Sequence, residues 1–511
     1  MGPLMGILTA GVVLSVVYLF AHVAAQSRGR AWREAANSVG LTDLVTSDFL
    51  GIERGITGRA GMLRVTLERY QRGRDERGTR IVIDGLGHPS YEFALRKEGV
   101  GSAIEKAFGE REIELGDRAF DDRAYIHGSP RVVHAVLDGE TRRLVGELIA
   151  GRIPTGPAGE PVKARVAVSD GALRAEIRER PFQPGGRRIP EALETLLVAA
   201  RRLVLPDDIP GRLAENVRTD PLATVRLSNL LTLTREYPDY EATRIALRAA
   251  GEDEDDEVRL RAAIALGDEG HAVLRQIAAS TDVEDGRSAR AVSALDVRLT
   301  GAEARGVLES SLAAGRPATA RAAVQVLGRV GGGEAVPALA AALEAEDDRL
   351  VVTAAGALGA TGDAAAEAPL IAALDRDGPA VWPAIAEALG RVGTAAAVVP
   401  LRTMAGRFPF DLGLRRASRQ AIAEIKSRLT GATPGQLALA DGDTGQLSLA
   451  EEGQEGQVSL APESEGAAEG ETQWPTDAQG GSLNEEALES TEGDDSSGGS
   501  ASRPPTPRET D

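Results

Sequence analysis

Five acidic and imidazole side chains lie in one short stretch of the chain and are its best candidates for chemistry. They are Asp117, Asp121, Asp122, His127 and His134. Paired carboxylates beside an imidazole can perform acid–base catalysis or hold a metal ion. The alternative, which we favour, is that Asp117 and Asp121 cap turns while Phe120 fills the core of the domain. A catalytic site requires these side chains to meet in one pocket, whereas caps can face different ways.

Other catalytic signatures are absent from the sequence. The chain has no cysteine, which excludes disulfides, thiol nucleophiles and cysteine-based metal sites. It also has no phosphate-binding glycine loop, HExxH motif or nucleophile-elbow serine. We therefore predict a protein that is not an enzyme and that has no cofactor, no metal ion and no small-molecule substrate. An enzyme with an uncharacterised site in residues 27–205 is the alternative.

The elements around these side chains predict a small α+β domain over residues 27–205. Alternating apolar and polar residues favour strands at 62–70, 79–84 and 91–95. Two further strands, 162–168 and 173–177, flank Asp170-Gly171, a dipeptide typical of a tight hairpin turn. Amphipathic patterns predict helices, and Pro190 suits the first turn of the last one. The predicted helices cover residues 31–39, 142–149 and 190–204.

The segment from Leu115 to Gly128, with its Gly-Asp-x-x-Phe-Asp pattern, has a recognisable context. It is followed by Val136-Leu137-Asp138, by the helix around Arg142 and by the hairpin. This order resembles an uncharacterised domain of bacterial membrane-anchored proteins, in which such a segment precedes a strand, a helix and a hairpin. The resemblance implies a fold for this part of the chain and no known activity.

A block of the form (Ala/Val)-x-(Ala/Val)-Leu-Gly-x-x-Gly recurs through residues 206–430, loosely in its first copy and degenerately in its second. The final glycines are separated by 31, 30, 31 and 31 residues. A fixed period of this length predicts stacked helix pairs, with each final glycine as a left-handed C-terminal cap and with Pro337, Pro369 and Pro400 near the starts of second helices. The signature residues are Gly270, Gly301, Gly331, Gly362, Gly393, Leu266, Leu327, Leu358 and Leu389.

These blocks resemble the short HEAT-like repeats that are named after phycobilin lyases. The resemblance implies an all-α HEAT-like solenoid whose surface binds proteins; lyase activity does not follow from it. The acidic run at 252–257 fits a solvated loop that caps the next helix better than a site for a basic partner. The partner of such a scaffold or adaptor is a protein that the sequence does not identify.

The N-terminal residues 1–26 are predicted to be a transmembrane anchor. Residues 3–25 carry no charge, and Arg28, Arg30 and Arg33 follow directly. We therefore expect a single-pass protein of the bacterial inner membrane with its main body in the cytoplasm. The alternative is a signal peptide cleaved after Ala25, which would give an exported binding protein.

The C-terminal residues 431–511 are predicted to be a disordered acidic tail. They hold 18 acidic and two basic residues, so that −16 of the chain's net charge of −19 lies here. The remainder is close to neutral, and we therefore expect no nucleic-acid binding. Three related segments, Gly435–Ala440, Gly445–Ala450 and Gly456–Ala461, alternate apolar residues. They fit a repeated extended binding motif, and equally a sequence duplication in a solubilising tail.

Overall fold

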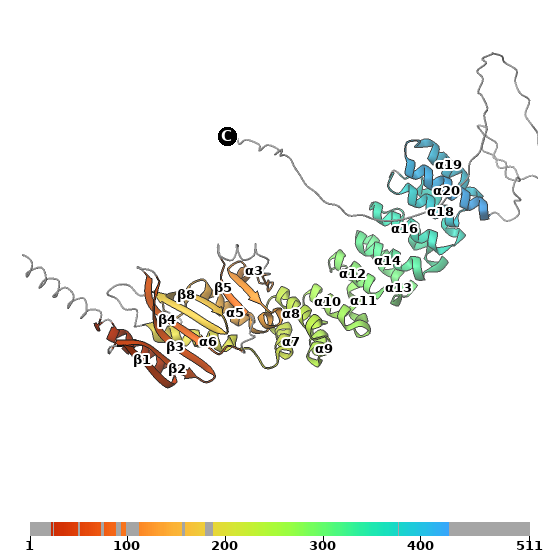
Figure 1. Ribbon diagram of the computed structural model, residues 1–511. Coiled ribbons are helices and arrows are strands. Elements are labelled where there is room, and N and C mark those ends of the chain that lie inside the picture. The colour runs from red at the N-terminus through yellow and green to blue at the C-terminus, as the bar shows by residue number, and fades with distance from the viewer. Residues whose placement is uncertain are drawn as a thin grey trace, which may run out of the picture. The chain divides into compact units, whose positions relative to one another are not determined.

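The computed structural model describes residues 22–428, except 24, 50–51, 73–75, 88–92, 99–111, 156–158, 179–187 and 377 (Figure 1). An antiparallel sheet with accompanying helices forms the first part, and an all-helical array follows it. The predicted tail at 431–511, with its three motif copies, lies outside the described residues. Almost all of the predicted anchor at 1–26 does so as well.

The sheet contains all the strands that the sequence predicts and four more. The strand order is β1-β2-β3-β4-β9-β8-β5-β6, β7 pairs with β8, and every pairing is antiparallel. The β1–β2 hairpin was not predicted, because β1 is exposed along its whole described length and shows no alternation of apolar residues. The strands are β1 (Thr42–Phe49), β2 (Ile52–Ala60), β3 (Leu63–Arg72), β4 (Glu76–Asp84), β5 (Phe93–Lys97), β6 (Ala124–Gly128), β7 (Arg152–Ile153), β8 (Val162–Ser169) and β9 (Ala172–Arg178).

The predicted hairpin turn is confirmed. Asp170 and Gly171 both have positive φ angles, 51° and 66°, and Ser169 pairs with Ala172 across the turn. A type I′ turn requires positive φ at two consecutive residues. Its backbone twist matches the right-handed twist of the strands that it joins.

Helices bury one apolar stripe each against this sheet. They are a helix over residues 25–38, α3 (Arg118–Asp121), α4 (Pro130–Val136), α5 (Gly139–Ile149) and α6 (Ile189–Leu203). Leu193 and Leu196 of α6 share a core with Ile81 and Ile83 of the sheet. In the first helix, Trp32 is fully buried and its indole N–H donates to Thr79 Oγ1 at 3.0 Å. Pro190 lies in the first turn of α6, as predicted.

The array consists of helix pairs. After α7–α9, the first helices of successive pairs are α10, α12, α14, α16 and α18, and each packs against the next, with α20 closing the series (Figure 1). Small buried side chains, many of them alanine, make up most of the shared core, which allows this close stacking. The helices are α7 (Ile209–Thr219), α8 (Ala223–Glu236), α9 (Glu241–Ala250), α10 (Asp256–Leu266), α11 (His271–Ala279), α12 (Asp285–Leu295), α13 (Gly301–Ala313), α14 (Pro317–Val330), α15 (Val336–Ala342), α16 (Asp348–Thr361), α17 (Glu367–Ala373), α18 (Trp382–Val392), α19 (Ala395–Arg407) and α20 (Leu412–Arg428).

The left-handed cap predicted for the five repeat glycines is found only at Gly362, although Gly331 and Gly393 do occupy the C-cap positions of α14 and α18. Gly362 is left-handed, with φ 66°, whereas Gly301 is the first residue of α13 and the others have negative φ. A close backbone approach explains three of these glycines instead. A Cβ at Gly270, Gly331 or Gly393 would lie 1.9, 2.7 or 2.5 Å from a carbonyl oxygen of the preceding helix.

The leucines of the repeat signature lie where apolar contacts are made. Leu327, Leu358 and Leu389 are fully buried in the shared core, and Leu266 is partly buried beside a neighbouring cluster. One proline expectation is wrong: Pro400 lies inside α19 and not near its start.

No helix among the described residues is both long enough and apolar enough to cross a membrane. This finding contradicts the predicted localisation as a single-pass inner-membrane protein. The arginines that supported the prediction belong to the amphipathic helix over residues 25–38, in which Trp32, Ala35 and Ala36 are buried in the sheet domain.

Candidate protein-interaction surface and its support

The first two of the predicted chemical side chains are caps. Asp117 precedes α3, and its Oδ1 accepts the backbone N–H of Phe120 at 3.2 Å. The carboxylate of Asp121 accepts the N–H groups of Leu115 and Gly116 at 3.2 and 3.0 Å. Burial raises the pKa of Asp121 despite these hydrogen bonds. Because Phe120 is buried in the core, the capping interpretation is confirmed.

The other three candidate side chains, Asp122, His127 and His134, lie in different environments. Asp122 is exposed beside Lys97, Arg123 and Arg152, and His127 is exposed on β6. His134 is buried in α4; burial, and then the charges of Arg235 and Arg142, lower its pKa to about 4. Within the described part of the chain, no group of three or more His, Cys, Asp or Glu could hold a metal ion.

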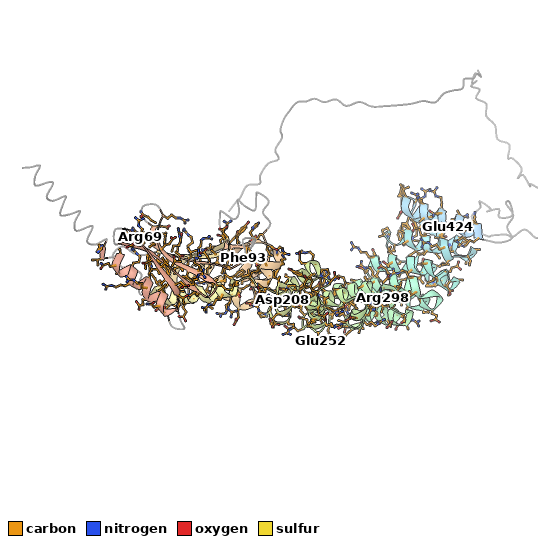
Figure 2. The ribbon with its side chains drawn as sticks, turned by 60° about the horizontal axis from the view of Figure 1, so that its bottom comes forward. Arg69, Phe93, Asp208, Glu252, Arg298 and Glu424 are labelled. Atoms are coloured by element: carbon orange, nitrogen blue, oxygen red, sulfur yellow. The ribbon has the colours of Figure 1, made fainter. Side chains whose placement is uncertain are left out.

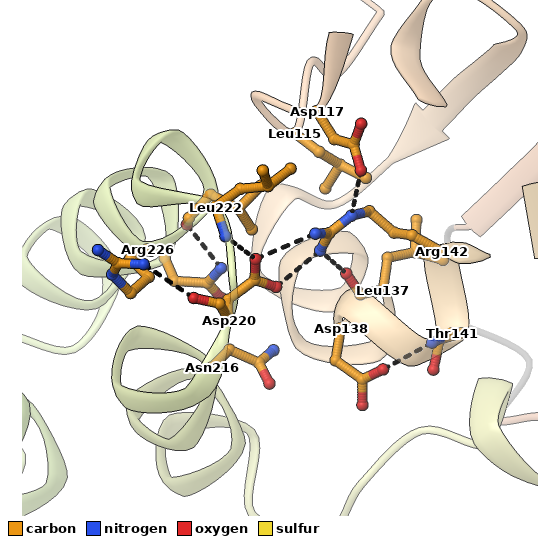
Figure 3. Close-up of polar contacts among 12 residues, drawn as sticks. Leu115, Asp117, Leu137, Asp138, Thr141, Arg142, Asn216, Asp220, Leu222 and Arg226 are labelled. Atoms are coloured by element: carbon orange, nitrogen blue, oxygen red, sulfur yellow. Dashed lines mark hydrogen bonds and ion pairs between the residues drawn. The ribbon is translucent and has the colours of Figure 1, made fainter. Parts of the chain in front are cut away.

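Asp117 has a second role at the junction between the sheet domain and the array. Its Oδ2 accepts Arg142 Nε at 2.9 Å, while the two Nη groups of Arg142 bind the carboxylate of Asp220 at 2.8 and 3.0 Å (Figure 3). Arg142 Nη1 also donates to the carbonyl oxygen of Leu137 at 2.9 Å. The Arg142 and Asp220 side chains are 3% and 0% exposed. Burial lowers the pKa of Arg142, but its hydrogen bonds to Asp220 and Asp117 outweigh this and raise it.

The polar network continues into the first helices of the array. The Asp220 carbonyl oxygen accepts Arg226 Nη1 at 3.0 Å (Figure 3). Arg226 also binds both carboxylate oxygens of Asp253, at 2.8 and 2.7 Å. Asn216 donates to the His134 carbonyl oxygen at 2.9 Å. These contacts join α4 and α5 to α7, α8 and the loop before α10.

The acidic run at 252–257 is therefore partly structural. Asp255 caps α10 by accepting the N–H groups of Glu257 and Val258, as the sequence predicted. Asp253, which was read only as part of a solvated loop, holds Arg226 instead. Glu257 binds three arginines, one in its own helix and two in α12, which are Arg261, Arg287 and Arg290.

Sequence reasoning missed the junction residues. The signal that could have found them is the place of Arg142 among apolar residues on one face of a predicted helix. A cation at such a position requires a buried carboxylate partner. Nothing in the sequence indicates that the partner is Asp220, 78 residues away.

A groove of about 520 Å³ crosses the first helices of three consecutive pairs, α12, α14 and α16. Small apolar side chains and three uncharged polar ones form most of its lining, and three charged side chains complete it. In chain order the lining residues are Ala289, Ser293, Ala318, Arg321, Ala322, Gln325, Asp348, Arg349, Val352, Thr353 and Ala380. Figure 2 shows the side chains of the array. In chain order α12 comes just before the labelled Arg298, and α14 and α16 lie between Arg298 and Glu424.

Of the three charged side chains in the groove, only the acidic one has an ion-pair partner among the described residues. Asp348 lies 3.6 Å from Arg376 outside the groove lining. The guanidinium groups of Arg321 and Arg349 form no hydrogen bond or ion pair within the described part of the chain. This contrasts with Arg261 and Arg290 on α10 and α12, which both bind Glu257. The groove thus presents two guanidinium groups without an acidic partner, among small apolar side chains.

A match to a known family agrees with the helix-pair architecture. Residues 304–382 match the family model for HEAT repeats, a range that includes α14 and α16 of the groove. No curated protein matches the chain in the sequence comparison. One similar solved structure is human deoxyhypusine hydroxylase in complex with glycerol, at 18% identity and a TM-score of 0.20. The similarity covers 43% of this chain and 96% of that one.

Proposed function

We propose that the chain is a scaffold or adaptor that binds a protein partner on the first-helix face of its helical array. The observation that carries the proposal is the groove across α12, α14 and α16, of which α14 and α16 lie within the stretch that matches HEAT repeats. Stacked repeats of this kind expose the same face of each unit in succession, which makes a continuous surface that suits a macromolecule.

The lining of the groove also suits a protein. Alanine and valine side chains offer apolar area, and Ser293, Gln325 and Thr353 offer hydrogen-bonding groups at intervals along it. A protein interface combines these two properties, with polar groups that fix orientation around an apolar centre.

No observation favours the enzyme alternative in residues 27–205. Asp117 and Asp121 hold backbone N–H groups at a helix start, and Asp117 also binds Arg142. His134 is buried against the junction, away from the exposed His127. A polar pocket near these residues is lined by Lys97, Glu98, Asp122, Arg123, Ala150 and Arg152, a set that combines opposite charges without a nucleophile or an imidazole.

The repeated motifs at Gly435–Ala440, Gly445–Ala450 and Gly456–Ala461 are proposed as additional contacts for a partner. Their support is the sequence alone: apolar residues alternate in an acidic surrounding, and three copies increase the effective affinity of a weak motif.

Affinity capture with the full chain from an extract of its source cells tests the proposed function. Val352 lines the groove on α16 and is 36% exposed, whereas Val399 lies on the second helix α19 and is 48% exposed. We expect at least one protein to be retained by the wild type and by Val399→Glu and to be lost from Val352→Glu. Retention of the same proteins by all three would contradict the proposed surface.

A further inference from the structure

We propose that the groove across α12, α14 and α16 accepts an extended, acidic segment of a partner protein. Apolar side chains of that segment would lie on the alanine and valine floor, and its carboxylates would pair with Arg321 and Arg349. The inference rests on the proposed protein-binding function and deepens it by naming the chemical class of the partner.

The two arginines supply the charge argument. They belong to consecutive first helices, Arg321 to α14 and Arg349 to α16, and neither has a partner among the described residues. Asp348, the acidic group of the lining, is already near Arg376. A guanidinium group binds a carboxylate through parallel hydrogen bonds, so this pair of cations selects a ligand with at least two carboxylates.

The spacing of the helices favours an extended ligand. Packed helices lie about 8–10 Å apart, and residues two apart on one side of an extended chain are separated by about 7 Å. Two flexible arginine side chains on adjacent helices can therefore reach two carboxylates on the same side of an extended segment. The side chains between them then point to the opposite side of the segment, where apolar ones can contact the alanine and valine side chains of the groove.

The uncharged polar groups point to the same conformation. Ser293, Gln325 and Thr353 come from three different helices and line one groove. An extended segment has free backbone N–H and C=O groups that such side chains can bind. The hydroxyls of Ser293 and Thr353 donate to the carbonyl oxygens of Ala289 and Arg349, one turn earlier in their own helices, so their oxygens can still accept N–H groups of a ligand. A helical ligand uses most of its N–H groups internally and would offer them few donors.

Charge also discriminates between macromolecules. A basic segment would be repelled by Arg321 and Arg349. A nucleic acid would require cations along a longer track, whereas the arginines of α10 and α12 that flank the groove, Arg261 and Arg290, are both held by Glu257. An acidic protein segment fits the two remaining cations and the apolar floor together.

Fluorescence anisotropy with the full chain tests this inference. The probe is a fluorescein-labelled ten-residue peptide in which glutamate alternates with leucine. Two control peptides replace glutamate by lysine, or leucine by serine, and a labelled uridine-rich RNA serves as the nucleic-acid control. We expect the glutamate–leucine peptide to bind most tightly and more weakly at higher salt, because exposed charges contribute to the complex.

Charge reversal identifies the groove. Arg321→Glu and Arg349→Glu should each weaken binding at least about tenfold, because a charge-assisted pair is replaced by a repulsion. Arg402 is an exposed arginine on the second helix α19, so Arg402→Glu is the matched control and should bind like the wild type. Far-UV circular dichroism and the melting temperature establish that each variant is folded.

Four outcomes would overturn the inference: equal binding of the lysine–leucine peptide, tighter binding of the RNA, an equal loss in Arg402→Glu, or binding only after residues 431–511 are removed. The last would assign the groove to the chain's own C-terminal segment. If affinity capture depends on Val352 but not on Arg321 or Arg349, the proposed function stands and the acidic ligand fails. If capture depends on none of the three, both fail.

Discussion

At the scale of single residues, the most consequential side chain is Arg142. It lies between Asp117 and Asp220, and its removal would leave the fully buried carboxylate of Asp220 without a cation and with only the backbone N–H of Leu222 as a donor. Such a loss costs much more than the loss of an exposed ion pair, because water cannot replace the missing cation. The exposed pair of Arg152 and Glu147 in the same domain offers a direct comparison.

We predict that Arg142→Met lowers the free energy of unfolding by about 3–5 kcal/mol, since it leaves a buried charge uncompensated. Arg152→Met should leave it nearly unchanged. The double variant Arg142→Met/Asp220→Leu should be more stable than Arg142→Met alone, because the fully buried carboxylate is removed and only that of Asp117, which is 19% exposed, has lost its cation. Urea denaturation followed by circular dichroism measures all three, and equal effects of Arg142→Met and Arg152→Met would refute the role of the junction.

A second residue-scale prediction concerns His134. Its pKa in the folded protein is about 4, because of burial and of the nearby charges of Arg235 and Arg142, while a histidine in the unfolded chain titrates near 6.5. Between these values the unfolded chain binds a proton that the folded chain does not, so stability falls as the pH drops from 6.5 to 4. The loss attributable to this group amounts to about 3 kcal/mol at most.

The measurement is urea denaturation as a function of pH. His134→Leu should flatten the dependence between pH 6.5 and 4, whereas the exposed His127 serves as the control through His127→Leu, which should keep the wild-type slope. The assignment to His134 is excluded if its replacement leaves that slope unchanged.

Asp296 has a strained backbone conformation, whereas a glycine occupies the corresponding position of the preceding repeat. It has φ 46° and ψ −126° at the end of α12, and Gly267 has φ 60° and ψ −123° at the end of α10. L-residues with a side chain rarely adopt this conformation. We predict that Asp296→Gly stabilises the protein by about 1 kcal/mol, despite losing the exposed ion pair with Arg329. Gly267→Ala should destabilise it in the same thermal-melting assay, and destabilisation by Asp296→Gly would contradict the strain.

At the scale of elements, glycines set how closely successive first helices approach. A Cβ at Gly328, in the middle of a repeat block, would lie 3.0 Å from Ala357 Cβ on the next first helix. A Cβ at Gly359 would lie 2.9 Å from Ala388 Cα. The Leu-Gly pair thus combines a buried leucine with a point of close backbone contact. This, and not left-handed capping alone, accounts for the glycine-rich period.

The contrast between two glycines of α16 tests this packing. Gly359→Ala should cost about 1–3 kcal/mol, because the added methyl group presses on the backbone of α18. Gly356 lies one turn earlier, and a Cβ there meets nothing within 4 Å. Gly356→Ala should stabilise the helix by about 0.5–1 kcal/mol, since glycine is a poor helix former. Thermal melts that show the same sign for both variants would contradict the proposed packing.

The elements were largely predictable from the sequence, and their contacts were not. Periodicity located the helix pairs, because each pair must bury one apolar stripe, and Asp170-Gly171 fixed a hairpin turn. Spacing alone contains no information on backbone angles, which is why a left-handed conformation was wrongly predicted at Gly270, Gly331 and Gly393. The junction was not predicted because Arg142 and Asp220 are far apart in sequence. The residues that line the groove were not predicted because they come together only where three helices stack.

At the scale of the whole molecule, the sheet domain and the helical array are joined by buried polar contacts and not by a bare linker. Arg142 connects Asp117 of one part to Asp220 of the other, and Gly116 approaches Thr224, whose hydroxyl donates to the Gly116 carbonyl oxygen at 2.6 Å. Experiments on the binding surface therefore use the full chain, because cutting between the two parts would leave Asp220 without its partner.

The most direct test of the central claim, that the first-helix face binds a protein, is site-specific photo-crosslinking in the producing cell. A photoreactive amino acid is placed at Val352 in the groove or at Val399 on the second helix α19. The account predicts a discrete crosslinked protein from position 352 and none from position 399. Identical crosslinking from both positions, or none from position 352, would contradict it.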